Sequence, residues 1–206
     1  MKQNFIPSHG GYRKLLSYQK AEIIYDATVY FTKRYFQRGD RTIDQMVQAA
    51  RSGKQNIAEA SLASGTSKET EIKLTNVARA SLEELLIDYQ DFLRVRNLSE
   101  WSPTHPFAER LNDLIRQKDA TYATFKKGIE NDDPSISANV IIGLIKIATY
   151  LLYRQILRLE QDFLKNGGLR ERMTQARLSV RNPQSKDAYD YPRRTNQTSQ
   201  TPQPPN

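Results

Sequence analysis

Residues 44–86 of the chain read DQMVQAARSGKQNIAEASLASGTSKETEIKLTNVARASLEELL. Their pattern predicts two helices, over residues 41–63 and 68–97, joined by a short turn. Gly65 ends the first helix, and Thr66-Ser67-Lys68-Glu69 has the pattern of a capping box for the second. Two helices of this length joined by a turn of a few residues are antiparallel neighbours.

Small residues occupy the predicted seam between these two helices. The inward positions include Ala50 and Gly53 on the first helix, and Ala78 and Ser81 on the second. An ordinary amphipathic hairpin would carry leucine and isoleucine there. A glycine inside a helix costs about 1 kcal/mol relative to alanine, and close approach of a neighbouring helix is the usual compensation. The pattern therefore predicts two closely packed helices.

Two further long helices complete the predicted core. Apolar residues recur at helical spacing over residues 17–38, and Gly39 and Asp40 then provide a helix stop and the N-cap of the next helix. Residues 135–165 predict a last core helix that is apolar on two faces, which indicates either a central position or an oligomer interface. We therefore predict an all-α fold, an antiparallel up-down four-helix bundle.

Residues 98–136 interrupt this pattern before the last core helix. Prolines punctuate the segment, and one amphipathic helix is predicted within it, over residues 107–127. We predict an irregular N-terminal lead over residues 1–14, followed by a bundle domain over residues 15–180 that includes this helical insertion. The composition of residues 181–206 is polar and poor in apolar residues, which predicts a disordered basic C-terminal tail.

The composition excludes several classes of protein. The chain has 206 residues, a net charge of +8 and no cysteine, so disulfides, thiolate nucleophiles and thiolate metal sites are excluded. The first residues contain no apolar segment typical of a secretory signal. The most apolar run, residues 140–152, is broken by Lys146. It is too short to span a bilayer, since a spanning helix needs about 20 apolar residues. We therefore expect a soluble cytoplasmic protein with no membrane partner.

No catalytic constellation is recognisable in the sequence. A di-iron site in a helical bundle needs Glu-x-x-His motifs on two helices, whereas His9 and His105 both lie in predicted loops. The same shortage argues against a histidine-dependent hydrolase triad. No glycine-rich phosphate loop has the required spacing. We therefore expect a protein that is not an enzyme and that has neither a metal site nor a cofactor.

Polar residues on or beside the predicted seam favour a hydrogen-bond network that fixes the register of the two helices. The residues of this predicted polar seam are Arg51, Asn56, Glu59, Ser81 and Glu84. The alternative is a ligand site or a catalytic carboxylate pair, for which two carboxylates alone are insufficient. On the last core helix, Tyr150, Tyr153 and Arg154 are expected to pack rather than to form a stacking surface.

Basic residues are the candidates for contact with nucleic-acid phosphates. From residue 165 to residue 194, eight Lys and Arg face three Asp and Glu, and a short basic helix is predicted over residues 169–180. The candidates are Lys54, Lys68, Lys73 and Arg79 on the hairpin, and Arg170, Arg172, Arg177 and Arg181 in the C-terminal extension. The alternative is a solvated helix surface. No base-reading motif is present, so any binding should be tolerant of sequence and sensitive to salt.

The hairpin resembles the four-helix-bundle family of ribosomal-RNA intervening-sequence proteins, which includes the accessory variability proteins (Avd) of diversity-generating retroelements. The matching residues are Arg51, Asn56-Ile57-Ala58-Glu59, Leu74, Ala78, Ala80-Ser81-Leu82-Glu83-Glu84-Leu85 and, more loosely, Leu151-Leu152. The resemblance covers residues 17–97 and 135–165, and the basic extension resembles a subgroup with a four-helix-bundle suffix domain. The chain departs from the family at Ala60, where glycine is usual, and in the length of the insertion.

This resemblance implies a homopentamer, and its retroelement members imply binding of a reverse transcriptase and of nucleic acid. We therefore expect a non-enzymatic homo-oligomer that binds RNA or DNA, or a nucleic-acid-handling enzyme, through basic surfaces. The alternative is a structural or adaptor oligomer that binds another protein and has no nucleic-acid role.

Overall fold

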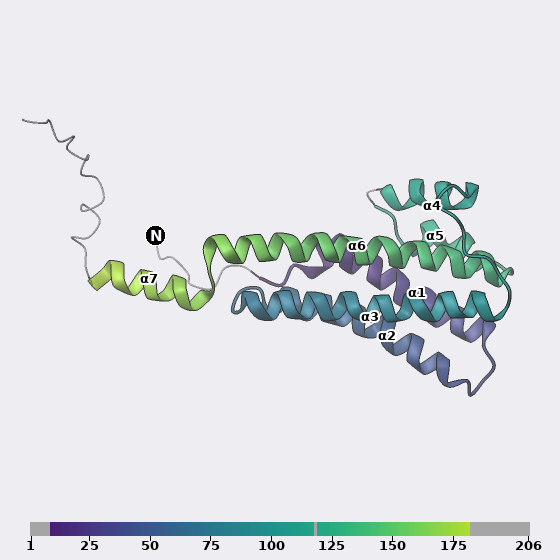
Figure 1. The fold of residues 1–206 in the computed structure, drawn as a ribbon, viewed down its shortest axis with the longest axis horizontal. Coiled ribbons are helices and arrows are strands. Elements are labelled where there is room, and N and C mark those ends of the chain that lie inside the picture. Colours follow the sequence, from purple (N-terminus) through teal and green to yellow (C-terminus); the bar gives the residue numbers. More distant parts are fainter. Residues whose placement is uncertain (1–8, 118, 182–206) are drawn as a thin grey trace, which may run out of the picture. The chain divides into compact units, whose positions relative to one another are not determined.

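A computed structural model describes residues 9–117 and 119–181 of the chain (Figure 1). These residues are helical and contain no strand, which confirms the predicted all-α class. The predicted irregular lead is described only from residue 9, and within it Tyr12–Lys14 forms a short 3-10 helix. The predicted disordered tail lies outside the described residues, apart from Arg181.

Four long helices of the described chain form its core: α1 (Leu16–Tyr35), α2 (Arg41–Ala63), α3 (Lys68–Val95) and α6 (Pro134–Asn166). α1 packs against α2 and α6, and α3 also packs against α2 and α6, so that each long helix has two long neighbours (Figure 1). The bounds predicted for α2 are those of the structure, whereas α1 and α3 each end before the predicted position.

Short polar side chains cap these helices. Asp40 caps α2 and Asp133 caps α6, and each carboxylate accepts a hydrogen bond from the backbone N–H two residues further on, at 2.9 and 2.8 Å. At the start of α3 the N-cap is Ser67 rather than Thr66. The predicted capping box is therefore wrong by one residue, because Glu69 accepts a hydrogen bond from the Ser67 hydroxyl instead of reaching back to the N-cap backbone.

The insertion contains two short helices instead of the single helix predicted over residues 107–127. α4 (Pro106–Arg116) packs against α6, and α5 (Tyr122–Ile129) packs against α6 and α1. The break follows from local chemistry: the backbone of Gln117 is extended, and Thr121 starts α5 with a reciprocal capping box.

The insertion explains why the first half of α6 is apolar on two faces. α1 and α3 cover one side of α6, and α4 and α5 pack on it as well, so Val140 and Leu144 are both buried. Further along α6 the outer face is open: Tyr150 and Tyr153 are 50% and 47% exposed, and Leu157 is 36% exposed. The expectation that these tyrosines pack inside the protein is therefore wrong for the single chain.

One helical stretch among the described residues, Pro134–Arg181, is long and apolar enough to cross a membrane by length and composition alone. This stretch is longer than the apolar run of residues 140–152. In the structure 61% of its most apolar window is buried, and a single stretch of this kind is weak evidence for a membrane span.

The first compact unit of the chain ends at Leu169, and a second unit begins at Arg170. Almost all of α7 (Leu169–Arg181) belongs to this second unit, although the predicted bundle domain extended to residue 180. α7 carries four arginines and one glutamate, in agreement with the predicted short basic helix.

Candidate functional site

The polar network at the α2–α3 seam is smaller than predicted. The hydroxyls of Ser52 and Ser81 lie 2.9 Å apart, and the Asn56 side-chain amide donates to the Ser52 carbonyl at 2.9 Å and to its hydroxyl at 3.2 Å. Ser52 was absent from the prediction because a serine on a helix gives no distinctive signal in a sequence.

The remaining predicted seam residues, Arg51, Glu59 and Glu84, lie on the exposed surface. Their positions on the helices turn them away from the Gly53–Ala78 contact line, so they are not part of the buried seam. No group of three or more metal-ligating side chains occurs within residues 9–117 and 119–181.

Two of the predicted phosphate-binding residues of the hairpin are half-buried. The Lys54 ammonium lies 4.1 Å from the centre of the Tyr25 ring, a cation–π contact. The Nε atom of Arg79 is buried and has no hydrogen-bond partner among the described residues. Both side chains therefore already make contacts within the chain or are partly covered by it.

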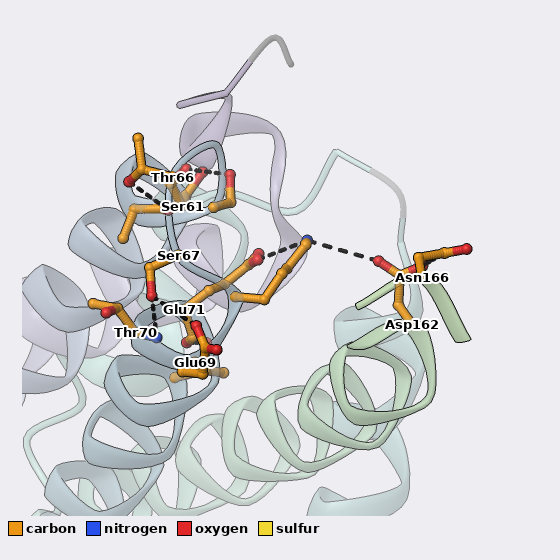
Figure 2. Close-up of polar contacts among 12 residues, drawn as sticks. Ser61, Thr66, Ser67, Glu69, Thr70, Glu71, Asp162 and Asn166 are labelled. Atoms are coloured by element: carbon orange, nitrogen blue, oxygen red, sulfur yellow. Dashed lines mark hydrogen bonds and ion pairs between the residues drawn. The ribbon is translucent and has the colours of Figure 1, made fainter. Parts of the chain in front are cut away.

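Lys68 is held by the carboxylates of Glu71 and Asp162, which Figure 2 labels. Its ammonium lies 2.8 Å from an oxygen of Glu71, which is only 7% exposed, and 3.7 Å from an oxygen of Asp162 on α6. Asp162 in turn accepts a hydrogen bond from Asn166 at 2.6 Å. This cluster ties the first turn of α3 to the end of α6, so the Lys68 ammonium is already paired with carboxylates of the chain itself.

Lys73 is exposed and lines a shallow groove between α3 and α6, which also contains Ile72 and Ile156. The carboxylates of Glu69 and Glu160 border the same groove. Two acidic side chains beside one lysine do not make a strongly basic patch. The structure therefore does not gather Lys54, Lys68, Lys73 and Arg79 into one basic surface.

The arginines of α7 are better presented. Arg170, Arg177 and Arg181 are exposed, and Arg172 is half-buried. Spacings of seven and four residues place Arg170, Arg177 and Arg181 on one face of a helix with 3.6 residues per turn. We call these three residues the arginine face of α7.

A cleft that the sequence analysis did not predict lies where α4 and α5 pack against α6. We call it the insertion cleft; its volume is about 410 Å³, and its characteristic lining residues are Trp101, Phe107, Arg110, Leu114, Lys127 and Val140. Phe107 is 52% exposed and Trp101 is half-buried. A cleft of this size, with apolar and aromatic walls and a few polar groups, is typical of ligand sites.

Hydrogen bonds from α6 and α3 fix the segment that carries Trp101. The Asn139 side chain, which is 3% exposed, accepts from the Trp101 N–H at 2.8 Å and donates to the Ser99 carbonyl at 3.0 Å. The neighbouring Glu100 accepts from Lys146 at 2.5 Å and from Gln90 at 3.0 Å. Partial burial of the carboxyl raises the pKa of Glu100, but the hydrogen bonds from Lys146 and Gln90 and the charge of Lys146 together outweigh burial and lower the pKa overall.

Two glycines allow the insertion to lie close to its neighbours. A Cβ atom on Gly143 of α6 would lie 2.5 Å from the Leu111 side chain of α4, and one on Gly128 of α5 would lie 2.9 Å from Val140 of α6. Larger residues at these positions would push α4 and α5 outward. The walls of the insertion cleft therefore depend on these close approaches.

His105 supports the aromatic wall rather than a catalytic group. Its ring stacks on Trp101 with ring centres 5.1 Å apart and an interplanar angle of 2°, and its Nδ1 accepts a hydrogen bond from the Phe107 N–H at 3.2 Å. Phe107 lies against Trp101 in turn, with ring centres 5.5 Å apart. The three rings form one fixed aromatic cluster at the start of α4.

No protein-family model, no curated protein and no solved structure matches this chain. The function is therefore inferred from the chemistry of the side chains of this chain alone.

Proposed function

We propose that this chain is a non-enzymatic, homo-oligomeric helical protein that binds nucleic acid, or an enzyme that handles nucleic acid, through basic surfaces. The observation that carries the proposal is the arginine face of α7. Arg170, Arg177 and Arg181 are exposed on one side of a helix that holds only one acidic residue, Glu171. Arginine is well suited to phosphate because its guanidinium donates two parallel hydrogen bonds.

The packing of the long helices supports the scaffold part of the proposal. α1, α2, α3 and α6 each contact two others, and turns of a few residues join α1 to α2 and α2 to α3. We infer an antiparallel up-down four-helix bundle with a helical insertion, similar to the ribosomal-RNA intervening-sequence and Avd proteins. A homopentamer of such bundles would repeat the arginine face five times, and repetition strengthens a weak contact.

A salt titration tests the nucleic-acid role. The full chain is titrated with a fluorescently labelled single-stranded oligonucleotide and with a duplex over a range of salt concentrations. We expect the logarithm of the affinity to fall linearly with the logarithm of the salt concentration, with a slope of about 0.7 to 0.9 per phosphate contact. Absence of binding at low salt would contradict the proposal.

The triple variant R170Q/R177Q/R181Q should bind more weakly and with a slope smaller by about 2 to 3. The matched control is R34Q/R94Q/R116Q, which removes the same charge from arginines that pair with Asp132, Asp91 and Asp113. Equal losses in the two variants would show that only net charge matters and would remove α7 as the binding surface.

The exposed row of Tyr150, Tyr153 and Leu157 on α6 favours a second candidate, an oligomeric adaptor that binds protein and not nucleic acid. Side chains at this spacing share one helix face, and all three are partly exposed in the described chain, where Tyr150 contacts Arg154 of the same helix. The molar mass in solution tests the oligomer in both candidates. We expect a multiple of the 23.8 kDa chain, reduced in Y150S/Y153S/L157S.

A further inference from the structure

We propose that the insertion cleft binds an unstacked base of single-stranded nucleic acid, with the base against Phe107 and Trp101 and the flanking phosphates on Arg110 and Lys127. This inference rests on the proposed function. It names the insertion cleft as a binding site and single-stranded nucleic acid as the class that binds there. Four features of the cleft support it.

The first feature is an accessible aromatic wall. Half of the Phe107 side chain is exposed, at 52%, and Trp101 is half-buried beside it. Bases stack on accessible aromatic rings without regard to sequence, because every base has a π-face. This tolerance fits the absence of a base-reading motif in the chain.

The second feature is that the wall is already ordered. Asn139 and Glu100 hold the backbone and side chains around Trp101, and the Trp101 ring stacks on His105. The His105 ring is itself oriented by its hydrogen bond to the backbone of α4. A fixed platform loses little side-chain entropy when a base stacks on it, so the geometry favours binding.

The third feature is the pair of cations on two different helices. Arg110 of α4 and Lys127 of α5 both line the cleft and are both exposed. Neither forms an ion pair with a described residue. By contrast, the nearby Arg116 and Lys126 pair with Asp113 at 3.7 Å and with Glu130 at 3.9 Å.

The fourth feature is the absence of a carboxylate from the described lining of the cleft. Two cations that form no ion pair with a described residue attract anions into a cleft whose lining holds no carboxylate. Their places on separate helices suit two phosphates better than one compact anionic head. A long-chain fatty acid is the alternative occupant, since it also joins an apolar body to an anion. Its single carboxylate would use only one of the two cations.

The sole tryptophan of the chain provides a direct readout, because tryptophan-selective excitation reports on Trp101 alone. The full-length protein is titrated with oligothymidylate, oligouridylate, a duplex of equal length, and oleate. After correction for absorbance by the oligonucleotide, we expect both single strands to quench the emission at low salt. The duplex should quench much less, because its bases are already stacked.

Paired variants separate the cleft from general charge. R110Q/K127Q should bind single strands at least fivefold more weakly, with a salt slope reduced by about 1.4. The matched control R116Q/K126Q removes the same charge from the same two helices outside the cleft and should bind nearly as the parent does. F107A should lose about fivefold to a hundredfold in affinity while keeping the helical circular-dichroism spectrum.

The outcomes distinguish this inference from the proposed function. If a labelled single strand binds but neither quenches Trp101 nor responds to R110Q/K127Q, the inference fails while the arginine face of α7 remains a binding surface. If no oligonucleotide binds at all, both fail. Quenching by oleate and not by single strands would assign the cleft to an apolar anion and overturn the inference.

Discussion

Gly53 of α2 lies directly against the side chain of Leu82 of α3, so that a Cβ atom on Gly53 would be 2.7 Å from Leu82 Cδ2 and 2.8 Å from its Cγ. Leu82 is completely buried. The glycine therefore provides the space into which a large side chain inserts. At this point of the hairpin, a small residue of α2 packs against a large residue of α3.

Replacement of Gly53 by alanine tests this packing. The added methyl group overpacks the seam at a cost of about 2 kcal/mol, while alanine favours the helix by about 1 kcal/mol. We expect a net loss of about 1 kcal/mol in the free energy of unfolding, measured by urea denaturation. The double variant G53A/L82V should recover part of this loss, because the shorter side chain leaves room for the methyl group. A gain in stability from G53A alone would show that the seam is not closely packed.

The sequence identified the hairpin correctly but not the way in which its seam is packed. Ala50, Gly53 and Ala78 are buried as the small-residue pattern predicts. The pattern could not show that Leu82 would fill the space beside Gly53, because one residue of difference along a helix turns a side chain by about 100°. The same uncertainty placed Glu59 and Glu84 at the seam, although both are exposed.

The Ser52–Ser81 hydrogen bond should contribute to the stability of the fold, whereas the exposed carboxylates of Glu59 and Glu84 should not. The hydroxyls are 2.9 Å apart and partly buried, so S52A and S81A should each cost about 1 kcal/mol in the free energy of unfolding. The double variant should cost less than the sum of the two, since both remove one bond. E59A and E84A are the controls and should change stability by less than about 0.5 kcal/mol. Equal losses of stability in all four variants would show that the carboxylates fix the register of α2 and α3 as much as the serines do.

The Lys68–Glu71 pair should also be structural. Glu71 is only 7% exposed, so K68Q leaves its carboxylate without its closest partner and should cost about 1 kcal/mol, a modest value because Lys68 is partly solvated. R94Q is the control, since Arg94 and Asp91 also pair but are both exposed, and it should have little effect. If K68Q instead lowered affinity for oligonucleotides with no change in stability, the original assignment of Lys68 to phosphate binding would stand.

The insertion cleft is the feature that sequence reasoning missed most completely. Trp101, Phe107, Arg110 and Lys127 lie in a segment whose prolines indicated only an irregular excursion. Their approach depends on two contacts between distant residues, Leu111 with Gly143 and Gly128 with Val140. Periodicity within one helix carries no information about such contacts. The sole tryptophan of the chain, Trp101, was the one signal in the sequence that could have marked the site.

Lys20 provides a test of buried charge. It is only 5% exposed, and its ammonium lies 5.3 Å from the centre of the Phe125 ring. Burial lowers the pKa of Lys20, because the charged form loses its hydration. K20M keeps the volume and removes the charge, so we expect a gain of about 1 kcal/mol in the free energy of unfolding at neutral pH. K33M, at an exposed position on the same helix, is the control and should show no gain. Destabilisation by K20M would show that the ring contact outweighs the lost hydration.

Tyr89 is the buried group that should govern stability in alkali. Its hydroxyl is fully buried and donates to Thr28 Oγ1 at 3.1 Å, while the Thr28 hydroxyl donates to the Ile24 carbonyl at 2.8 Å. Burial raises the pKa of Tyr89 far above its usual range, whereas the hydrogen bond with Thr28 opposes this shift. The folded chain therefore keeps the proton that the unfolded chain releases near pH 10.

The effect of the substitution Y89F on the free energy of unfolding should therefore change sign with pH. Below about pH 10 neither state ionises, and loss of the hydrogen bond should make Y89F about 1 kcal/mol less stable than the parent. Above about pH 10 the parent should lose up to about 1.4 kcal/mol per pH unit through Tyr89, because only its unfolded state ionises, and Y89F lacks this loss. The two curves of unfolding free energy against pH should therefore converge and cross near pH 11, as measured by urea denaturation at each pH. Y150F, which removes the hydroxyl of a half-exposed tyrosine, should follow the parent throughout. Parallel curves for Y89F and the parent would show that the Tyr89 hydroxyl ionises as readily in the folded chain as in the unfolded one.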